Sequence, residues 1–71
     1  MHVARCTIDR QPGHAYVAFE DGKGEVIYMS TAIKCGKSTS MKELVRRAFR
    51  QAPRFLPGGM MTYAWQDNRI S

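Results

Sequence analysis

The chain has 71 residues, 44% of them hydrophobic, and a formal net charge of +5 at pH 7. This length suits one domain with one core, and the hydrophobic share is too high for a disordered tail. No apolar run approaches the roughly 20 residues of a membrane helix, and the N-terminal residues lack the apolar core of a secretion signal. We therefore expect a soluble, cytoplasmic protein.

The first half of the chain predicts three strands. Apolar and polar residues alternate over residues 3–9 and again over residues 15–20, with a break at Gln11-Pro12-Gly13. The segment 20–24 contains two glycines, which allow a hairpin turn, and residues 25–31 are rich in β-branched and aromatic side chains. These strands are expected to form a meander.

A helix is predicted over residues 41–52. Ser40 and Glu43 form a capping box at its start, and Pro53 disfavours helical geometry at its end. Its apolar residues recur at spacings of three and four, which is typical of a helix with one buried face. They are Met41, Leu44, Val45, Ala48, Phe49 and Ala52.

A fourth strand is predicted over residues 60–66, after the turn Pro57-Gly58-Gly59. The order is then βββαβ. Because one apolar stripe can cover only one side of a sheet, the predicted fold class is α+β. We expect a single domain over residues 1–71, with an antiparallel sheet of about four strands and one amphipathic helix on one face.

The basic residues are concentrated between residues 34 and 54. This stretch has seven of them against one acid, Glu43, and a net charge of +6. Clustered arginine and lysine residues indicate a surface that binds phosphates or acidic proteins, although a basic helix face can also serve only solubility. The predicted contact residues are Lys34, Lys37, Lys42, Arg46, Arg47, Arg50 and Arg54.

The segment from Thr31 to Ser38 resembles the end of a phosphate-binding P-loop, because Gly36-Lys37-Ser38 precedes a helix. The glycine that the motif requires five positions earlier is Thr31, so nucleotide hydrolysis is not predicted. A single phosphate could still dock at the helix N-terminus. The alternative is a loop whose lysines only face water.

Two cysteines and two histidines are the candidate metal ligands or nucleophiles, namely His2, Cys6, His14 and Cys35. They lack the close pairs of a zinc site, and no oxyanion site or third orienting residue accompanies either cysteine. Two cysteines are also too few to cross-link a secreted scaffold. We expect two free thiols, no catalytic residues, no metal and no cofactor.

Four aromatic residues could stack on bases from an exposed sheet face, as in RNA-binding sheets. They are Tyr16, Tyr28, Tyr63 and Trp65. Burial of most of them in the core is the stronger expectation. If the sheet face opposite the helix is nevertheless apolar, we expect two copies to associate through it as a homodimer.

The layout of the chain resembles that of small phage-encoded host-takeover proteins, among them anti-CRISPR proteins and inhibitors of bacterial RNA polymerase. The helix from Ser40 to Ala52 and the strand from Met60 to Trp65 carry this resemblance of size and layout. It implies a protein that occupies a surface of a host complex.

The βββα order also resembles the start of a ribonuclease H-like fold and its partial version in HicB-type antitoxins. Asp9 is the only acidic residue expected in a strand that could hold the catalytic magnesium of such an enzyme. One carboxylate cannot make that site.

The sequence thus predicts a small non-enzymatic inhibitory or regulatory protein. It would dock on a host macromolecular or nucleoprotein complex through the basic helix face, without membrane contact. The alternative is direct nucleic-acid binding, in which the same basic residues contact phosphates.

Overall fold

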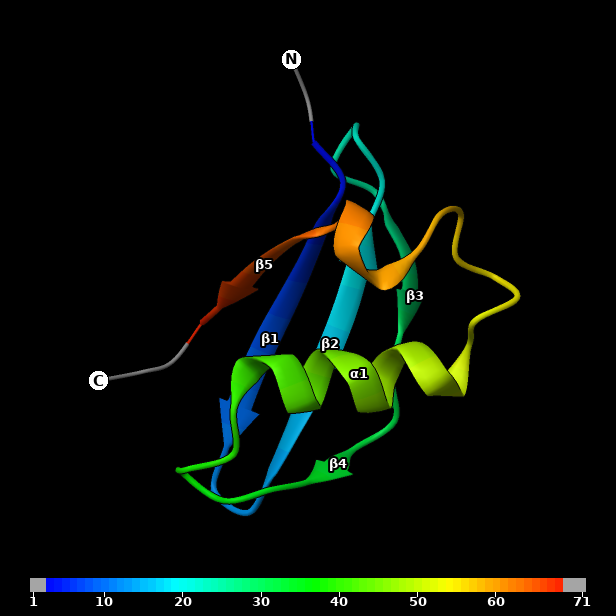
Figure 1. Ribbon diagram of the computed structural model, residues 1–71. Helices are drawn as coiled ribbons and strands as arrows, with labels where there is room; N and C mark the ends of the chain where they lie inside the picture. The colour runs from blue at the N-terminus through cyan, green and yellow to red at the C-terminus, as the bar shows by residue number, and fades with distance from the viewer. Residues whose placement is uncertain (1–2, 69–71) are drawn as a thin grey trace.

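The computed structural model describes residues 3–68 and consists of one mixed sheet and one main helix (Figure 1). Strand β1 (Arg5–Gln11) pairs antiparallel with β2 (His14–Glu20) across a turn in which Gly13 has a φ of 82°. Glycine adopts this left-handed conformation without the steric cost that a side chain brings. On its other side β1 pairs parallel with β5 (Ala64–Asp67).

The predicted third strand, over residues 25–31, is shorter than expected, and a further strand that was not predicted follows it. β3 (Val26–Met29) and β4 (Ile33–Lys34) pair with opposite ends of β2, and the path through the sheet is β3-β2-β1-β5. Ser30 separates them, because its N–H donates to the Val17 carbonyl at 2.8 Å while its Oγ accepts from the Val17 N–H at 2.9 Å. The side chain therefore completes the pairing of β2 where the backbone of β3 turns away.

The α+β class is confirmed, but two expectations about the last strand are wrong. The sheet is mixed and not purely antiparallel, because β5 runs parallel to β1. Residues Met60–Thr62 form a short 3-10 helix, η1, which the Thr62 N–H closes by donating to the Gly59 carbonyl at 3.0 Å. Met61 is 76% exposed as a result, although its place in the alternating pattern predicted an ordinary strand position.

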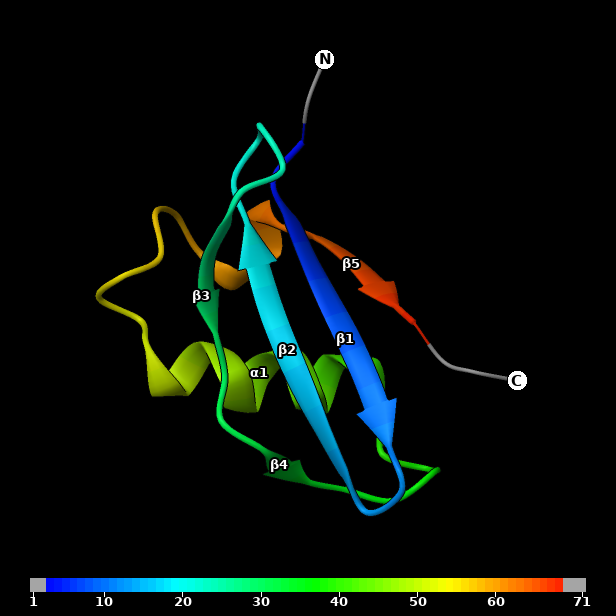
Figure 2. The same ribbon diagram turned by 180° about the vertical axis from the view of Figure 1, so that it is seen from behind.

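Helix α1 (Met41–Gln51) crosses one face of the sheet and leaves the other face uncovered (Figures 1 and 2). Ser40 caps it as predicted, with its Oγ accepting from the Glu43 N–H at 3.1 Å. The reciprocal half of the predicted capping box is not formed, because the Glu43 carboxylate pairs with Arg46 and Arg47. The helix ends at Gln51, one residue before the predicted boundary, and Ala52 is the C-cap. Within residues 3–68, no helix has the length and apolar character needed to span a membrane.

The core lies between α1 and the inner face of the sheet. The Phe19 ring is fully buried and meets the rings of Tyr63 and Phe49 edge-on, with centroids 5.2 and 6.3 Å apart. Such edge-to-face pairs add to the stabilisation from burial alone. The buried cluster consists of Cys6, Ile8, Ala15, Val17, Phe19, Ile33, Leu44, Val45, Ala48, Leu56 and Tyr63.

A partly buried ion pair ties the end of the chain to the start of the helix. Arg10 Nε donates to Asp67 Oδ2 at 3.0 Å, which links β1 to β5. The same guanidinium donates through Nη2 to the Thr39 carbonyl at 2.6 Å and through Nη1 to the Gly36 carbonyl at 3.5 Å. Only 9% of the Arg10 side chain is exposed. One planar group thus fixes the loop that enters α1 against both strands.

Substitution of Ser30 tests the junction between β3 and β4. We expect Ser30→Ala to lower the free energy of unfolding by about 1–3 kcal/mol, because it leaves the buried Val17 N–H without its partner. Chemical denaturation measures the change. Ser38→Ala, at an exposed loop position, is the matched control and should change stability by no more than about 0.5 kcal/mol. An equal, small effect of both substitutions would contradict this role of Ser30.

Candidate functional site

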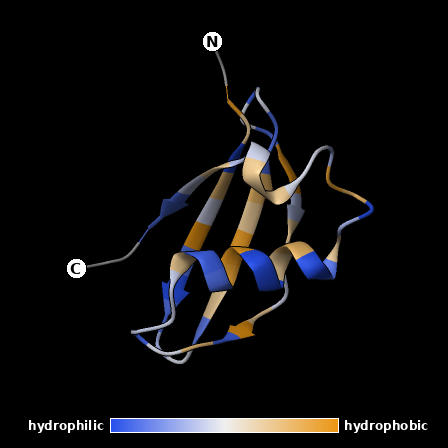
Figure 3. Cartoon of the chain, viewed as in Figure 1, coloured by the Kyte–Doolittle hydropathy of each residue, from blue (hydrophilic) through white to orange (hydrophobic). Residues whose placement is uncertain are grey.

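The candidate site is the outward face of α1 and the segment that follows it. Lys42, Arg46 and Arg50 are four residues apart, so their side chains form one row along the helix with a rise of about 6 Å between neighbours. Arg47 flanks this row, and Arg54 follows the end of the helix. We call these five residues the basic helix face. Figure 3 shows the hydrophilic colour concentrated along this side of α1.

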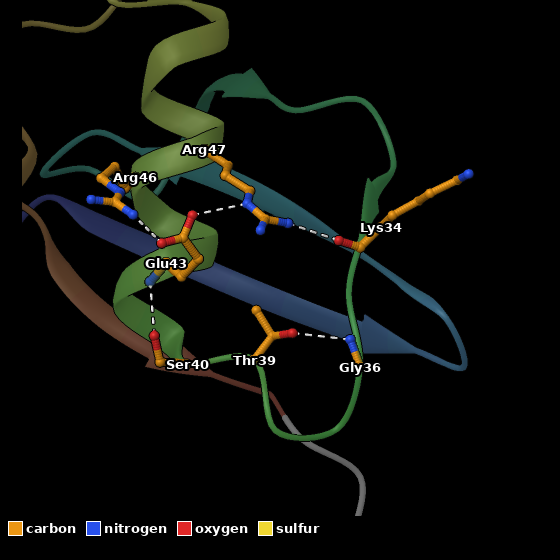
Figure 4. Close-up of polar contacts among 7 residues, drawn as sticks. All are labelled: Lys34, Gly36, Thr39, Ser40, Glu43, Arg46 and Arg47. Atoms are coloured by element: carbon orange, nitrogen blue, oxygen red, sulfur yellow. Dashed lines mark hydrogen bonds and ion pairs between the residues drawn. The ribbon is translucent and has the colours of Figure 1, made fainter.

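Glu43 lies in the middle of the basic helix face and holds two of its arginines. Arg46 Nη2 pairs with Glu43 Oε1, and Arg47 Nε donates to Glu43 Oε2 at 2.9 Å (Figure 4). The hydrogen bond from Arg47, together with Arg46, lowers the pKa of Glu43 below its ordinary value. Glu43 is therefore ionised at neutral pH. The basic helix face has a net charge of +4 from five basic residues and this one acid.

Arg47 has a second, structural role. Its Nη1 donates to the Lys34 carbonyl at 2.9 Å, so the guanidinium bridges α1 and β4 (Figure 4). Among the contacts within residues 3–68, neither a hydrogen bond nor an ion pair holds the side chains of Lys42, Arg50 or Arg54, and all three are exposed. These three cations can meet a partner without first breaking a contact within the protein.

The structure does not bring all seven predicted contact residues together. Lys34 stands opposite His14 in the register of β4 with β2, which places its side chain on the sheet face away from α1. Figure 4 shows the Lys34 ammonium extending away from the arginines. Lys37 lies in the loop before α1, beside Cys35 and Arg10 around a surface depression of about 690 Å³. Lys34 and Lys37 are thus separate from the basic helix face.

The loop before α1 uses its own polar groups for internal hydrogen bonds. The Gly36 N–H donates to Thr39 Oγ1 at 3.0 Å, and the Thr39 N–H donates to the Gly36 carbonyl at 3.2 Å (Figure 4). The Glu43 N–H donates to Ser40 Oγ. These contacts favour a folded capping loop over a phosphate cradle at this helix start.

The cysteines do not share a site with the acids or with His14. Cys6 is fully buried between strand and helix, and burial raises its pKa to about 12. Cys35 is partly exposed, and its N–H donates to the Gly13 carbonyl at 3.2 Å. Within residues 3–68, no three His, Cys, Asp or Glu side chains lie close enough to hold a metal ion. His2 lies outside the described residues.

Asp9 and Asp67 occupy strands but face opposite sides of the sheet. Asp67 pairs in register with Ile8, on the side of α1, and binds Arg10. Asp9, the next residue along β1, faces the other side, where it accepts from Gln11 Nε2 at 3.1 Å. Because the fourth strand was predicted to end at residue 66, Asp67 was not considered as an acidic residue within a strand. The two carboxylates do not converge on one magnesium ion.

Of the four aromatic residues considered for base stacking, Tyr63 is buried in the core as expected. Tyr28 and Trp65 are partly buried and pack against the core, while Tyr16 is 36% exposed on the uncovered face of the sheet. The most exposed aromatic is Phe55, at 73%. It follows Arg54, and the buried residues Ala52 and Leu56 anchor its segment on both sides. Phe55 was not predicted as a site residue, because an isolated apolar residue in a turn gives no periodic signal in the sequence.

Comparisons with protein-family models, curated proteins and solved structures find no match to this chain.

The environment of Glu43 predicts a dependence of stability on pH. A carboxyl whose pKa is lowered on folding contributes stability above its ordinary pKa of 4.5, and this contribution is lost as the pH falls through the lowered value. We therefore expect Glu43→Gln to be less stable than wild type at neutral pH, with the difference shrinking at acid pH. Denaturation curves across this range measure it. A difference that does not vary with pH would argue against the ion pairs with Arg46 and Arg47.

The two thiols are expected to differ sharply in reactivity. Because the thiolate is the nucleophile, burial and the raised pKa of Cys6 protect it, whereas Cys35 is accessible. Iodoacetamide should label native wild type once, at Cys35, and should leave native Cys35→Ser unlabelled. Mass spectrometry counts the labels, and unfolding in denaturant should expose both thiols. Rapid labelling of Cys6 in the folded state would contradict the described packing.

Proposed function

We propose that this protein is a non-enzymatic inhibitory or regulatory protein that docks on an acidic surface of a macromolecular complex. The observation that carries the proposal is the basic helix face, which has a net charge of +4. Three of its side chains, those of Lys42, Arg50 and Arg54, are exposed and hold no hydrogen bond or ion pair within residues 3–68. Clustered cations of this kind steer association with anionic partners and define the binding orientation.

Two features favour a protein surface over a phosphate backbone as the partner. Glu43 places a negative charge in the middle of the basic helix face, where it would repel phosphates and where it already pairs with two arginines. The exposed Phe55 beside Arg54 supplies an apolar group next to the cations. Protein interfaces combine such aromatic and arginine anchors with a charged rim.

Direct nucleic-acid binding is the second candidate function. The row formed by Lys42, Arg46 and Arg50 could follow phosphates, and Phe55 could stack on a base. A labelled oligodeoxythymidine is a suitable probe. A phosphate binder should lose affinity linearly with the logarithm of the salt concentration, with a slope that reports the number of phosphates contacted. An absence of binding at low salt would rule out this candidate.

Charge reversal on the basic helix face tests the leading proposal. We expect Arg50→Glu with Arg54→Glu to abolish capture of a defined protein complex from nuclease-treated bacterial lysate. Within residues 3–68 these exposed side chains hold no hydrogen bond or ion pair, so the fold should survive. Lys23→Glu with Lys37→Glu removes the same charge at exposed loop positions outside the basic helix face, and should leave capture unchanged. An equal loss of capture in both variants would mean that binding depends on the total charge of the protein and not on the position of the cations.

Nuclease treatment separates the two functions in the same experiment. A protein complex that is retained after nuclease and lost only in the α1 variant supports docking on protein. Bound material that disappears with nuclease in wild type would overturn the leading proposal and support the second. Retention of the complex by the α1 variant would exclude the basic helix face as the contact surface.

A further inference from the structure

The sheet face opposite α1 is covered by no other part of residues 3–68 (Figure 2). Side chains on this open face alternate with the buried ones along each strand, and the strand register sets them side by side. The open face consists of Arg5, Thr7, Asp9, Gln11, His14, Tyr16, Ala18, Glu20, Val26, Met29, Lys34, Ala64 and Gln66.

The apolar residues of the open face lie mainly on β3 and on the neighbouring part of β2. Ala18 stands between Thr7 on β1 and Met29 on β3, and Tyr16 follows on the same side of β2. Met29 is 57% exposed and Val26, further along β3, is 54% exposed. A sheet face that meets only water usually carries polar residues at such positions. The exposed apolar side chains along β3 are therefore the part of the open face that a partner would cover.

The charge distribution identifies a second copy of the chain as a compatible partner. The open face carries Arg5 and Lys34 against Asp9 and Glu20, so its formal charge is zero, whereas the chain carries +5. Two copies that met through their α1 sides would repel each other strongly. Two copies that meet through their open faces avoid this like-charge contact.

The charges on the open face are arranged so that the open faces of two copies can pair opposite charges. On β1, Arg5 stands at the start of the strand and Asp9 near its end. Across the sheet the order of signs is reversed, because Glu20 pairs with Arg5 and Lys34 lies beside the start of β2. A two-fold axis lying in the face and across the strands would set Arg5 near Asp9 of the second copy, and Glu20 near its Lys34. This symmetry is that of the commonest homodimers.

The overall size of the molecule is compatible with such an interface. The molecule measures 32 × 25 × 17 Å along its principal axes. A face of 32 by 25 Å offers at most about 800 Å² per copy, which is the area that a standard stable interface buries on each partner.

From these observations we propose that the protein forms a two-fold symmetric homodimer through the open face of its sheet. Two stacked sheets then form the centre, with Tyr16, Ala18 and Met29 of each copy at the contact. The basic helix faces point outward on opposite sides, so one dimer presents two of them. The dimer does not depend on the proposed function, but it would give such a binder two equivalent docking surfaces.

Substitution of Met29 with lysine is the first test. Sedimentation equilibrium of wild type over a dilution series should give twice the monomer mass of 8.1 kDa at high concentration. We expect Met29→Lys to remain monomeric, because it buries an unpaired charge in the contact. Met61→Lys is the matched control, since Met61 is exposed on η1, outside the open face. Circular dichroism checks that both variants are folded.

A charge exchange tests the proposed symmetry. Arg5→Asp should weaken the dimer by at least several-fold, because the carboxylate introduced at position 5 would face Asp9 of the second copy with like charge. Adding Asp9→Arg to Arg5→Asp restores opposite signs and should recover much of the dimer affinity. A merely structural role of either residue would not give this recovery.

Three outcomes would overturn the proposal. Wild type could sediment as a monomer at every concentration. It could form a dimer that Met29→Lys does not affect, which would place the contact elsewhere. Finally, Ile27→Lys, at the β3 residue that has no partner in the register with β2, could disrupt a dimer that Met29→Lys and Tyr16→Lys leave intact, which would place the contact at β3 outside the open face.

Discussion

The parallel pairing of β1 with β5 is the constraint on which the rest of the structure depends. Two parallel neighbours cannot be joined by a tight turn, so the chain must cross over one face of the sheet before it returns. The segment between β4 and β5 makes this crossover, and α1 is its regular part. The Ala64 N–H donates to the Ala4 carbonyl and the Asn68 N–H to the Ile8 carbonyl, which extends the ladder at both ends. Arg10 adds the bond to Asp67 that closes the same seam.

The crossover divides the molecule into two sides of different character. The α1 side receives the basic residues of the helix, because its apolar stripe faces the core and its charged residues face water. The other side of the sheet is left open, with a balanced charge and a partly apolar centre. The two proposals therefore concern opposite surfaces. An acidic partner would meet α1, and a second copy of the chain would meet the open face.

The basic helix face is less uniform than its composition indicates. Glu43 neutralises part of it, and the Arg47 guanidinium is shared between Glu43 and the Lys34 carbonyl. Two of the three exposed cations that hold no hydrogen bond or ion pair within residues 3–68, Arg50 and Arg54, lie at the C-terminal end of the helix and beyond it, where Phe55 is also exposed. A partner would therefore meet two exposed arginines and an apolar side chain at the same end of α1.

The sequence alone determined the helix, its cap, its buried stripe and the first two strands, because these depend on local periodicity and on side chains that satisfy nearby backbone groups. It did not determine the direction of β5 or the separation of β3 from β4, which depend on long-range pairing and on the Ser30 side chain. The pattern at Met61 was compatible with both a strand and a helical turn. Only the tertiary structure placed Lys34 on the far side of the sheet and joined Arg10 to Asp67, because residues 57 positions apart meet only when the strands pair.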